Sequence, residues 1–184
     1  MANKKITKDS ILDCAVELIR QGDELSARNI AKRLGCSTQP IYSVFKNMAE
    51  LEGELYLYIQ RIHKTYIAQY AVHKGILDYK AFGMGFVKFA KIEKQLFSRL
   101  YIQKPFDRKC LEEDAYFIEV VKTIQEEYGI SHQQAVQFHL DMTIYSYGLA
   151  VMQHADSDMS DDEISQRLTT QFRALYNLYF DKKD

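Results

Sequence analysis

Residues 26–45, SARNIAKRLGCSTQPIYSVF, contain two short helical patterns separated by a turn signal. Ser26 is a good N-cap for a helix over residues 27–34, because its side chain can accept a hydrogen bond from a free backbone N–H. Gly35 ends that helix, since glycine readily adopts a left-handed turn conformation. We expect Ser37 to cap the next helix. Two short helices joined by a tight turn predict a helix-turn-helix.

Pro40 lies inside the second helical pattern, although proline normally breaks the interior of an α-helix. With Ser37 as the N-cap, Thr38, Gln39 and Pro40 occupy the first three helical positions. Backbone N–H groups in that turn have no intrahelical acceptor, so the missing proton of proline costs little there. The sequence therefore predicts a rigid first turn that points Thr38 and Gln39 outward, while Ile41 anchors the helix inward.

The outward residues of this second helix have the chemistry that DNA recognition requires. In helix-turn-helix proteins the N-terminal part of the second helix meets the base edges. Gln39 can form two hydrogen bonds to adenine, which discriminates by about 1–3 kcal/mol, and Thr38 can contact a thymine methyl group. Phosphates can be bound by the N-terminus of the first helix and by flanking cations. The predicted DNA-binding residues are Ser26, Arg28, Ser37, Thr38, Gln39, Pro40, Tyr42, Ser43 and Lys46.

The composition of the whole chain favours an all-α protein. Its 184 residues include only two prolines and eight glycines, and residues with high helix propensity are abundant. Apolar periodicity indicates further helices, which gives about nine in total. These helices are expected over 8–21, 48–72, 79–92 and 94–102, around 117–128, over 132–154, and in a last segment that includes Leu168, Phe172, Leu175 and Tyr179.

The charge and cysteine content place limits on the class of protein. The net charge of −1 argues against a globally basic nucleic-acid binder, although residues 1–50 carry +2 and residues 51–184 carry −3. That asymmetry permits a phosphate-facing N-terminal module. The three cysteines are scattered and form no C-x-x-C pair, as in reduced cytosolic proteins. With no apolar leader and no run of about 20 apolar residues, we expect a soluble cytoplasmic protein without membrane contact.

The predicted helix over 132–154 carries two apolar stripes, although a helix on a monomer surface needs only one. Either one face packs on a second subunit, or the helix is buried centrally within one chain. We favour a homodimer through the last two helices, because homodimers are the commonest oligomers; which face meets the partner stays open. The predicted interface comprises Val136, Leu140, Ile144, Tyr147, Leu149, Met152, Leu168, Phe172, Leu175 and Tyr179.

The stretch from Gly22 to Leu51 resembles the N-terminal domain of the TetR family of bacterial transcriptional regulators. The residues that carry the resemblance are Ser26, Ile30-Ala31, Leu34-Gly35-Cys36-Ser37, Pro40, Tyr42, Phe45, Asn47 and Leu51. Cys36 departs from the pattern, because an aliphatic residue is usual there, and Met48 stands where lysine is common. The remaining chain is similar in architecture only. The resemblance implies a cytoplasmic homodimer that binds a palindromic operator in double-stranded DNA and represses transcription until a small-molecule effector moves its two DNA-binding heads.

On this basis we expect a helix-turn-helix DNA-binding domain over 1–47 and a helical effector-binding and dimerisation domain over 48–184. Aromatic residues of the second domain can line a cavity for an apolar or aromatic ligand, or they can simply fill a core. Gly83 and Gly85 favour a cavity, because they leave volume within a helical pattern. The candidate pocket residues are Phe82, Phe86, Phe89, Phe97, Tyr101, Phe117, Phe138, Met142 and Tyr145.

Motifs for catalysis and for cofactor binding are absent from the sequence. It contains no P-loop, G-x-G-x-x-G, G-x-S-x-G or H-E-x-x-H pattern, and its histidines are dispersed. We therefore expect no enzymatic activity, no cofactor and no metal site. Two alternatives stay open. One is a regulator of the same fold that is controlled by a protein partner or has no effector, and the more remote one is a helical enzyme.

Overall fold

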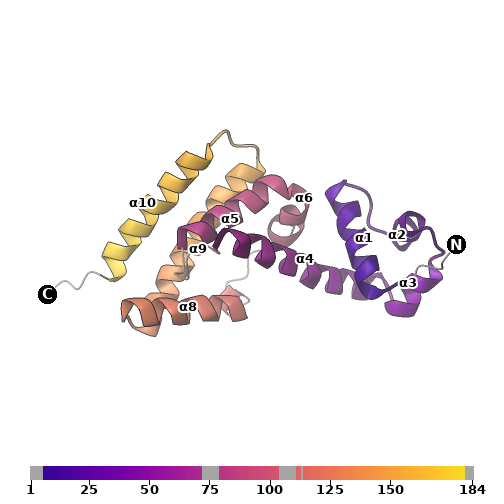
Figure 1. Cartoon of the computed structure of the whole chain (residues 1–184), viewed down its shortest axis with the longest axis horizontal. Coiled ribbons are helices and arrows are strands. Elements are labelled where there is room, and N and C mark those ends of the chain that lie inside the picture. The colour runs from indigo at the N-terminus through magenta and orange to yellow at the C-terminus, as the bar shows by residue number, and fades with distance from the viewer. Residues whose placement is uncertain (1–5, 72–78, 104–110, 113, 181–184) are drawn as a thin grey trace. The chain divides into compact units, whose positions relative to one another are not determined.

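The computed structural model describes residues 6–71, 79–103, 111–112 and 114–180, and every regular element in these ranges is helical (Figure 1). The elements are α1 (Lys8–Arg20), α2 (Ala27–Leu34), α3 (Gln39–Val44), α4 (Met48–Ala71), α5 (Tyr79–Ile92), α6 (Lys94–Phe97), the π-helical turn η1 (Ser98–Ile102), α8 (Ala115–Tyr128), α9 (His132–His154) and α10 (Asp161–Tyr179). The predicted all-α class is confirmed.

The helices form two compact units that do not follow the predicted boundary. The first unit comprises residues 1–65 and 93–104, and the second comprises 66–92 and 105–184. We expected a boundary after residue 47, whereas the first unit continues through most of α4 to residue 65. The apolar side of α4 explains this, since Leu51 and Leu55 have no exposed surface. We call the part of the first unit formed by α1, α2 and α3 the head.

Short-range capping signals set the helix ends in the first unit. Asn47 caps α4, since its Oδ1 accepts a hydrogen bond from the Glu50 backbone N–H at 2.9 Å. Thr7 caps α1 in the same way, since its Oγ1 accepts from the Ser10 N–H at 3.2 Å, a cap that the sequence reading missed. Gly22 follows α1 with a φ of +74°, a conformation that glycine adopts without strain. These local contacts fix where the head begins and where α4 leaves it.

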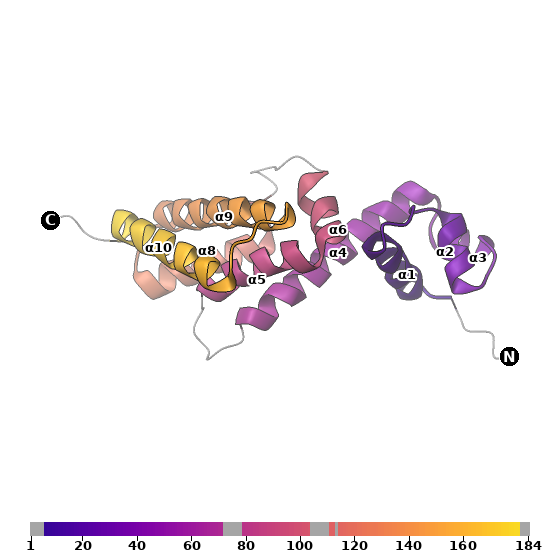
Figure 2. The ribbon, with the colours of Figure 1, turned by 90° about the horizontal axis from the view of Figure 1, so that it is seen from above.

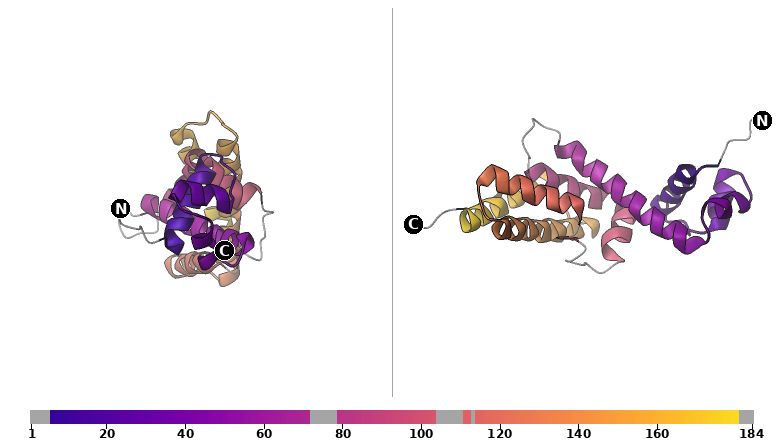
Figure 3. Two further views of the ribbon diagram at one scale, coloured as in Figure 1. Left: turned by 90° about the vertical axis from the view of Figure 1, so that its right-hand side faces the viewer. Right: turned by 90° about the horizontal axis from the view of Figure 1, so that it is seen from below.

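In the second unit, α9 is the central helix, and α5, α8 and α10 pack against it (Figure 2). Figure 3 shows α8 and α9 lying side by side when the molecule is seen from below. Phe138 of α9 is fully buried in the core formed with α8 and α10. None of the helices in the described part of the chain has the length and apolarity that a bilayer crossing requires.

Gly83 and Gly85 of α5 mark close helix contacts, so the prediction that they leave a void is wrong. A β-carbon at Gly83 would lie 3.0 Å from Cδ2 of Leu168 and 3.3 Å from Oγ of Ser146. A β-carbon at Gly85 would lie 3.2 Å from Cα of Ile67. These spacings are tighter than ordinary van der Waals contact. The missing side chains therefore let neighbouring helices approach α5.

Candidate nucleic-acid interface

The turn between α2 and α3 has the geometry of a helix-turn-helix. At its start, Oγ of Ser26 accepts a hydrogen bond from the Asn29 N–H at 3.2 Å, which confirms the predicted N-cap of α2. Gly35 ends α2 with a φ of +69°. The Cys36 N–H then donates to the Ala31 carbonyl at 3.0 Å, as in a Schellman motif. This closed C-terminus redirects the chain into α3 with few intervening residues.

The start of α3 differs from the prediction by one residue. Thr38, not Ser37, occupies the N-cap position, and its side chain makes no capping hydrogen bond. The Thr38 carbonyl accepts from the N–H groups of Ile41 at 3.1 Å and Tyr42 at 3.2 Å. Pro40 is therefore the second residue of the helix. Its missing N–H still removes no intrahelical bond, so the physical explanation of the proline survives the shift in register.

The predicted DNA-contacting residues of α3 lie on its outer face. Gln39 and Ser43 are exposed, and the Tyr42 side chain is 49% exposed. The inner face is anchored by Ile41, which is 1% exposed, and by Phe45, which is 2% exposed. A short helix held by two buried apolar residues thus presents a polar surface to its surroundings.

The residues that flank α3 also present polar groups outward. Arg28, Ser37, Thr38 and Lys46 are exposed, whereas Ser26 and Pro40 are partly buried. Within the described ranges, neither Arg28 nor Lys46 takes part in an ion pair. The Ser43 hydroxyl already donates to the Pro40 carbonyl at 2.7 Å, so its remaining hydrogen-bonding capacity is as an acceptor. A phosphate therefore meets the two cations more readily than it meets Ser43.

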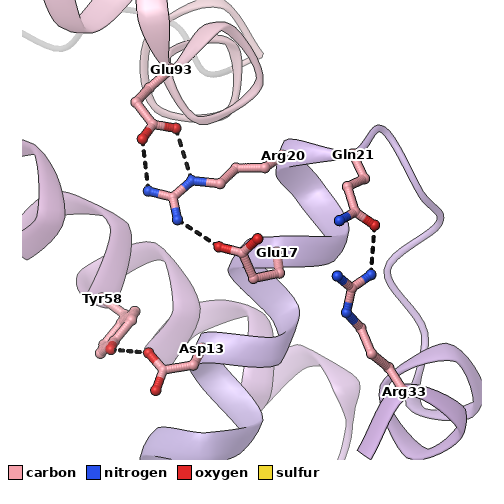
Figure 4. Close-up of polar contacts among 7 residues, drawn as sticks. All are labelled: Asp13, Glu17, Arg20, Gln21, Arg33, Tyr58 and Glu93. Atoms are coloured by element: carbon pink, nitrogen blue, oxygen red, sulfur yellow. Dashed lines mark hydrogen bonds and ion pairs between the residues drawn. The ribbon is translucent and has the colours of Figure 1, made fainter.

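Polar contacts join the head to the other helices of the first unit (Figure 4). The Tyr58 hydroxyl of α4 donates to Asp13 of α1, and this bond raises the pKa of the phenol. Lys8 Nζ lies 2.9 Å from Oε2 of Glu54 on α4. Arg20, at the end of α1, hydrogen-bonds Glu93. Both α4 and the segment that begins α6 are thus bonded to α1.

The residues of the predicted ligand pocket are distributed over both units. Phe97 and Tyr101 belong to the first unit, and the other seven belong to the second. In the first unit the Tyr101 hydroxyl lies 3.0 Å from Nδ1 of His63. Burial lowers the pKa of His63 to about 3, so its imidazole is neutral at physiological pH. Tyr101 therefore contributes to a buried polar contact of the first unit.

Within the second unit, several predicted pocket residues fill the core. Phe89 and Phe138 are 0% exposed, so neither side chain borders a water-sized void. Met142 is 2% exposed and Phe117 is 3% exposed. Phe89, Phe138 and Met142 therefore fill the core and do not line a cavity, since neighbouring side chains already cover them. Only the half-buried members of the predicted set in this unit, Phe82, Phe86 and Tyr145, keep partial exposure.

A polar pair inside this aromatic core escaped the sequence analysis. The Tyr79 hydroxyl and Nδ1 of His139 form a hydrogen bond, and the His139 ring lies 4.5 Å from the ring of Phe117. Desolvation lowers the pKa of His139 to about 4 and raises that of Tyr79. The sequence feature that could have indicated this pair is His139, which follows Phe138 within an apolar stripe. The neutral imidazole is thus held by one hydrogen bond among aromatic rings.

A pocket of about 400 Å³ lies between α8 and the start of α9. It shares only Phe117 with the predicted ligand pocket, and Val136 with the predicted dimer interface. The other lining residues were not anticipated. They are Glu112, Ile118, Val121, His132 and Gln133.

The predicted dimer interface is partly taken up by the chain's own core. Leu140, Leu149, Leu168 and Leu175 are 0–7% exposed within a single chain. Their assignment to a partner surface is therefore wrong, because α5, α8, α9 and α10 bury one another. Four further members, Val136, Tyr147, Phe172 and Tyr179, are partly buried.

Two members of the predicted interface are open on the surface of α9. Ile144 and Met152 are each 52% exposed. Gly148, between them, is also exposed, and a β-carbon there would meet nothing within 4 Å. The three residues are four apart, so they lie along one side of the helix. We call this surface the α9 ridge.

Neither a metal site within the described residues nor a known relative adds to the description of this interface. In the parts of the chain that the structure covers, no group of three or more His, Cys, Asp or Glu residues is arranged to hold a metal ion. No protein-family model matches the chain, and no curated protein is significantly similar to it.

Proposed function

We propose that this protein is a sequence-specific DNA-binding regulator of transcription whose helix α3 reads bases in the major groove. The observation that supports this proposal most directly is the arrangement of α2 and α3 in the head. A left-handed glycine ends α2, and Ile41 and Phe45 anchor the next helix. Gln39 and Tyr42 are exposed on its outer side. This is the arrangement with which a helix-turn-helix presents its recognition helix.

The chemistry of the exposed groups supports a division of labour. Gln39 has the donor and acceptor needed for two hydrogen bonds to adenine. The cations Arg28 and Lys46 lie on either side of α3 in the sequence and are exposed, so they can meet the phosphates that flank the bases. Thr38 and Tyr42 are exposed beside Gln39 and extend the same surface.

We propose further that the protein acts as a repressor and that it does so as a homodimer. Two copies related by a two-fold axis would place two heads on the half-sites of a palindromic operator. The α9 ridge, formed by Ile144, Gly148 and Met152, is the part of the predicted interface that remains exposed. It supports the proposal that α9 meets the partner subunit.

Release of the operator by an apolar or aromatic ligand is one form of control that we propose. One observation favours the alternative, in which a protein partner or no effector acts on the regulator. Phe89 and Phe138, which were expected to line the ligand cavity, are fully buried by other side chains. We expect no enzymatic role, because the sequence contains no P-loop, G-x-G-x-x-G, G-x-S-x-G or H-E-x-x-H pattern.

The test is selection of bound duplexes from genomic fragments by the full-length protein, followed by gel-shift titration of the enriched sequence. We expect a palindrome whose affinity falls about 5- to 150-fold in Gln39→Ala, equivalent to about 1–3 kcal/mol. Gln166→Ala, at an exposed position of α10, is the matched control and should bind like the unaltered protein. Failure to enrich any sequence, or equal binding by Gln39→Ala, would reject the proposed role of α3.

A further inference from the structure

Arg20, the last residue of α1, bonds to two carboxylates at once (Figure 4). Its Nε donates to Oε2 of Glu93 at 2.9 Å, and its Nη2 donates to Oε1 of the same carboxylate at 2.7 Å. Its Nη1 donates to Oε1 of Glu17 at 2.7 Å. Paired, parallel hydrogen bonds of this kind are among the strongest side-chain contacts and fix the relative orientation of both groups. All three residues belong to the first unit.

Glu93 lies at a boundary between the two units in the sequence. It joins α5 to α6, and Ile92 before it belongs to the second unit. Its φ of −102° and ψ of 49° lie outside the helical region, so the chain bends here. Although Glu93 occupies the N-cap position of α6, its side chain makes no capping hydrogen bond. The Glu93 carboxylate therefore accepts hydrogen bonds from Arg20 of α1 and does not cap α6.

The shielding of this contact distinguishes it from an ordinary surface ion pair. The Glu93 side chain is 17% exposed and that of Arg20 is 35% exposed. Fully exposed pairs contribute about 0–1 kcal/mol, because water and salt screen them. A bidentate pair with a largely covered carboxylate is screened less. Hydrogen bonding to Glu93 raises the pKa of Arg20, so the cation persists at all physiological pH values.

The position of α1 governs the position of α3. Cys14 Sγ of α1 lies 3.8 Å from the Ile30 carbonyl of α2. Arg33 of α2 donates to Gln21 Oε1 at 2.6 Å, beyond the end of α1 (Figure 4). Because α2 leads into α3 through a short closed turn, a contact that orients α1 also orients the helix that carries Gln39.

We propose that the Arg20–Glu93 pair is a coupling clamp, which fixes the head to the residue where α5 passes into α6 and thereby sets the affinity for a two-site operator. The inference rests on the proposed function for its DNA readout. With the clamp closed, each head of a dimer keeps one orientation, and both heads are ready for their half-sites. With the clamp open, that orientation must be restored on binding, which lowers the affinity.

The mechanical part is tested without DNA, by hydrogen exchange on the full-length protein. We expect Glu93→Gln and Arg20→Gln each to speed exchange at the end of α1 and in α6, while α9 keeps its protection. The charge-reversed double variant, Arg20→Glu with Glu93→Arg, restores a pair of opposite charges and should recover most of the protection. Unchanged exchange in both single variants would overturn the clamp.

The DNA part compares the full palindrome with a duplex that contains one half-site. We expect Glu93→Gln to bind the palindrome about tenfold more weakly and to bind the half-site as the unaltered protein does, because a single head needs no fixed partner orientation. The reversed pair should restore palindrome binding. Equal losses on both duplexes would mean that the pair acts only on folding, and would overturn the inference.

A matched control separates the clamp from ion pairs in general. Arg167 Nη2 lies 2.9 Å from Oε1 of Glu163 on α10, a similar pair in the second unit. Arg167→Gln should change neither exchange in α1 nor the binding of either duplex. If that variant weakened palindrome binding as Glu93→Gln does, the effect would not belong to the clamp. If the unaltered protein bound no DNA, the proposed function would be rejected. The hydrogen-exchange experiment would still show whether the Arg20–Glu93 pair holds α1 to α6.

Discussion

Each of the two units has its own buried apolar core, which is mainly aliphatic in the first unit and rich in aromatic rings in the second. In the first unit, polar side chains bond one helix to another, as between Lys8 and Glu54 or between Arg20 and Glu93. In the second, aromatic rings fill the spaces between helices, and Phe138 alone lies against the rings of Tyr79, Phe172 and Phe180, among others.

This difference has a physical consequence for how each unit responds to change. An exposed pair such as Lys8–Glu54 can break and re-form at low cost, because water replaces either partner, whereas the more shielded pair of Arg20 and Glu93 is screened less. A closely packed aromatic core has no such substitute, so a lost ring leaves a cavity. We therefore expect the breaking of an exposed ion pair in the first unit to cost less stability than the loss of an aromatic ring from the second.

The largest expected effect is in the aromatic core. Phe138→Ala removes a side chain that is 0% exposed, and we expect the free energy of unfolding of the second unit to fall by about 3–5 kcal/mol. Urea unfolding measures the loss, and hydrogen exchange locates it. The matched control is Ile118→Ala on α8, where the side chain is 54% exposed and the change should be below about 0.5 kcal/mol. Equal loss of protection in α1 and in α9 would show that the two units do not differ as described.

Acid should destabilise the protein through its desolvated imidazoles. The pKa of His139 is lowered from the ordinary value of 6.5 to about 4. Below pH 6.5 the unfolded chain binds a proton that the folded ring does not bind until about pH 4. Its contribution to stability is therefore intact above pH 6.5 and is lost as the pH falls through this window. From pH 6.5 to pH 4.5 we expect a loss of about 2 kcal/mol from this group, measured by urea unfolding.

Two variants separate this effect from general acid destabilisation. His139→Gln removes the titrating ring and should flatten the dependence of unfolding free energy on pH. His132→Gln, at an exposed position of the same helix, is the control for replacing a histidine with glutamine. Identical pH profiles for the unaltered protein and His139→Gln would contradict the assignment. His63 makes the same test possible in the first unit, because burial lowers its pKa to about 3.

Much of the fold could be predicted from the sequence, because helix ends depend on neighbouring residues. The cap at Ser26 and the left-handed glycine at position 35 were predicted, and both form. Each is decided within about four residues of chain. The cap of α3 was misplaced by one residue, since Ser37 and Thr38 are chemically similar and only the backbone angles distinguish them.

Features that depend on contacts between residues far apart in the chain could not be predicted from the sequence. The close approach of Leu168 to Gly83 is decided by how α10 packs on α5, so a glycine in a helical pattern was read as a void. Leu140 and Leu149 were read as partner contacts, because periodicity does not say which neighbour covers a face. The pairing of Arg20 with Glu93 joins residues far apart in the chain, and a single sequence gives no sign of it.

The smallest expected effect compares one N-cap from each unit. Ser26 Oγ caps α2, which has 8 residues, and Ser160 Oγ accepts from the Glu163 N–H at 3.1 Å to cap α10, which has 19 residues. Loss of either cap should lower the unfolding free energy by about 1 kcal/mol, as urea titration would measure. Only Ser26→Ala should also weaken operator binding, because the short helix α2 orients α3 and has fewer other contacts to hold its first turn. Ser160→Ala is the matched control, since α10 is long and lies in the second unit. If both variants weakened operator binding equally, loss of stability alone would explain the effect, and the cap of α2 would have no particular role in orienting α3.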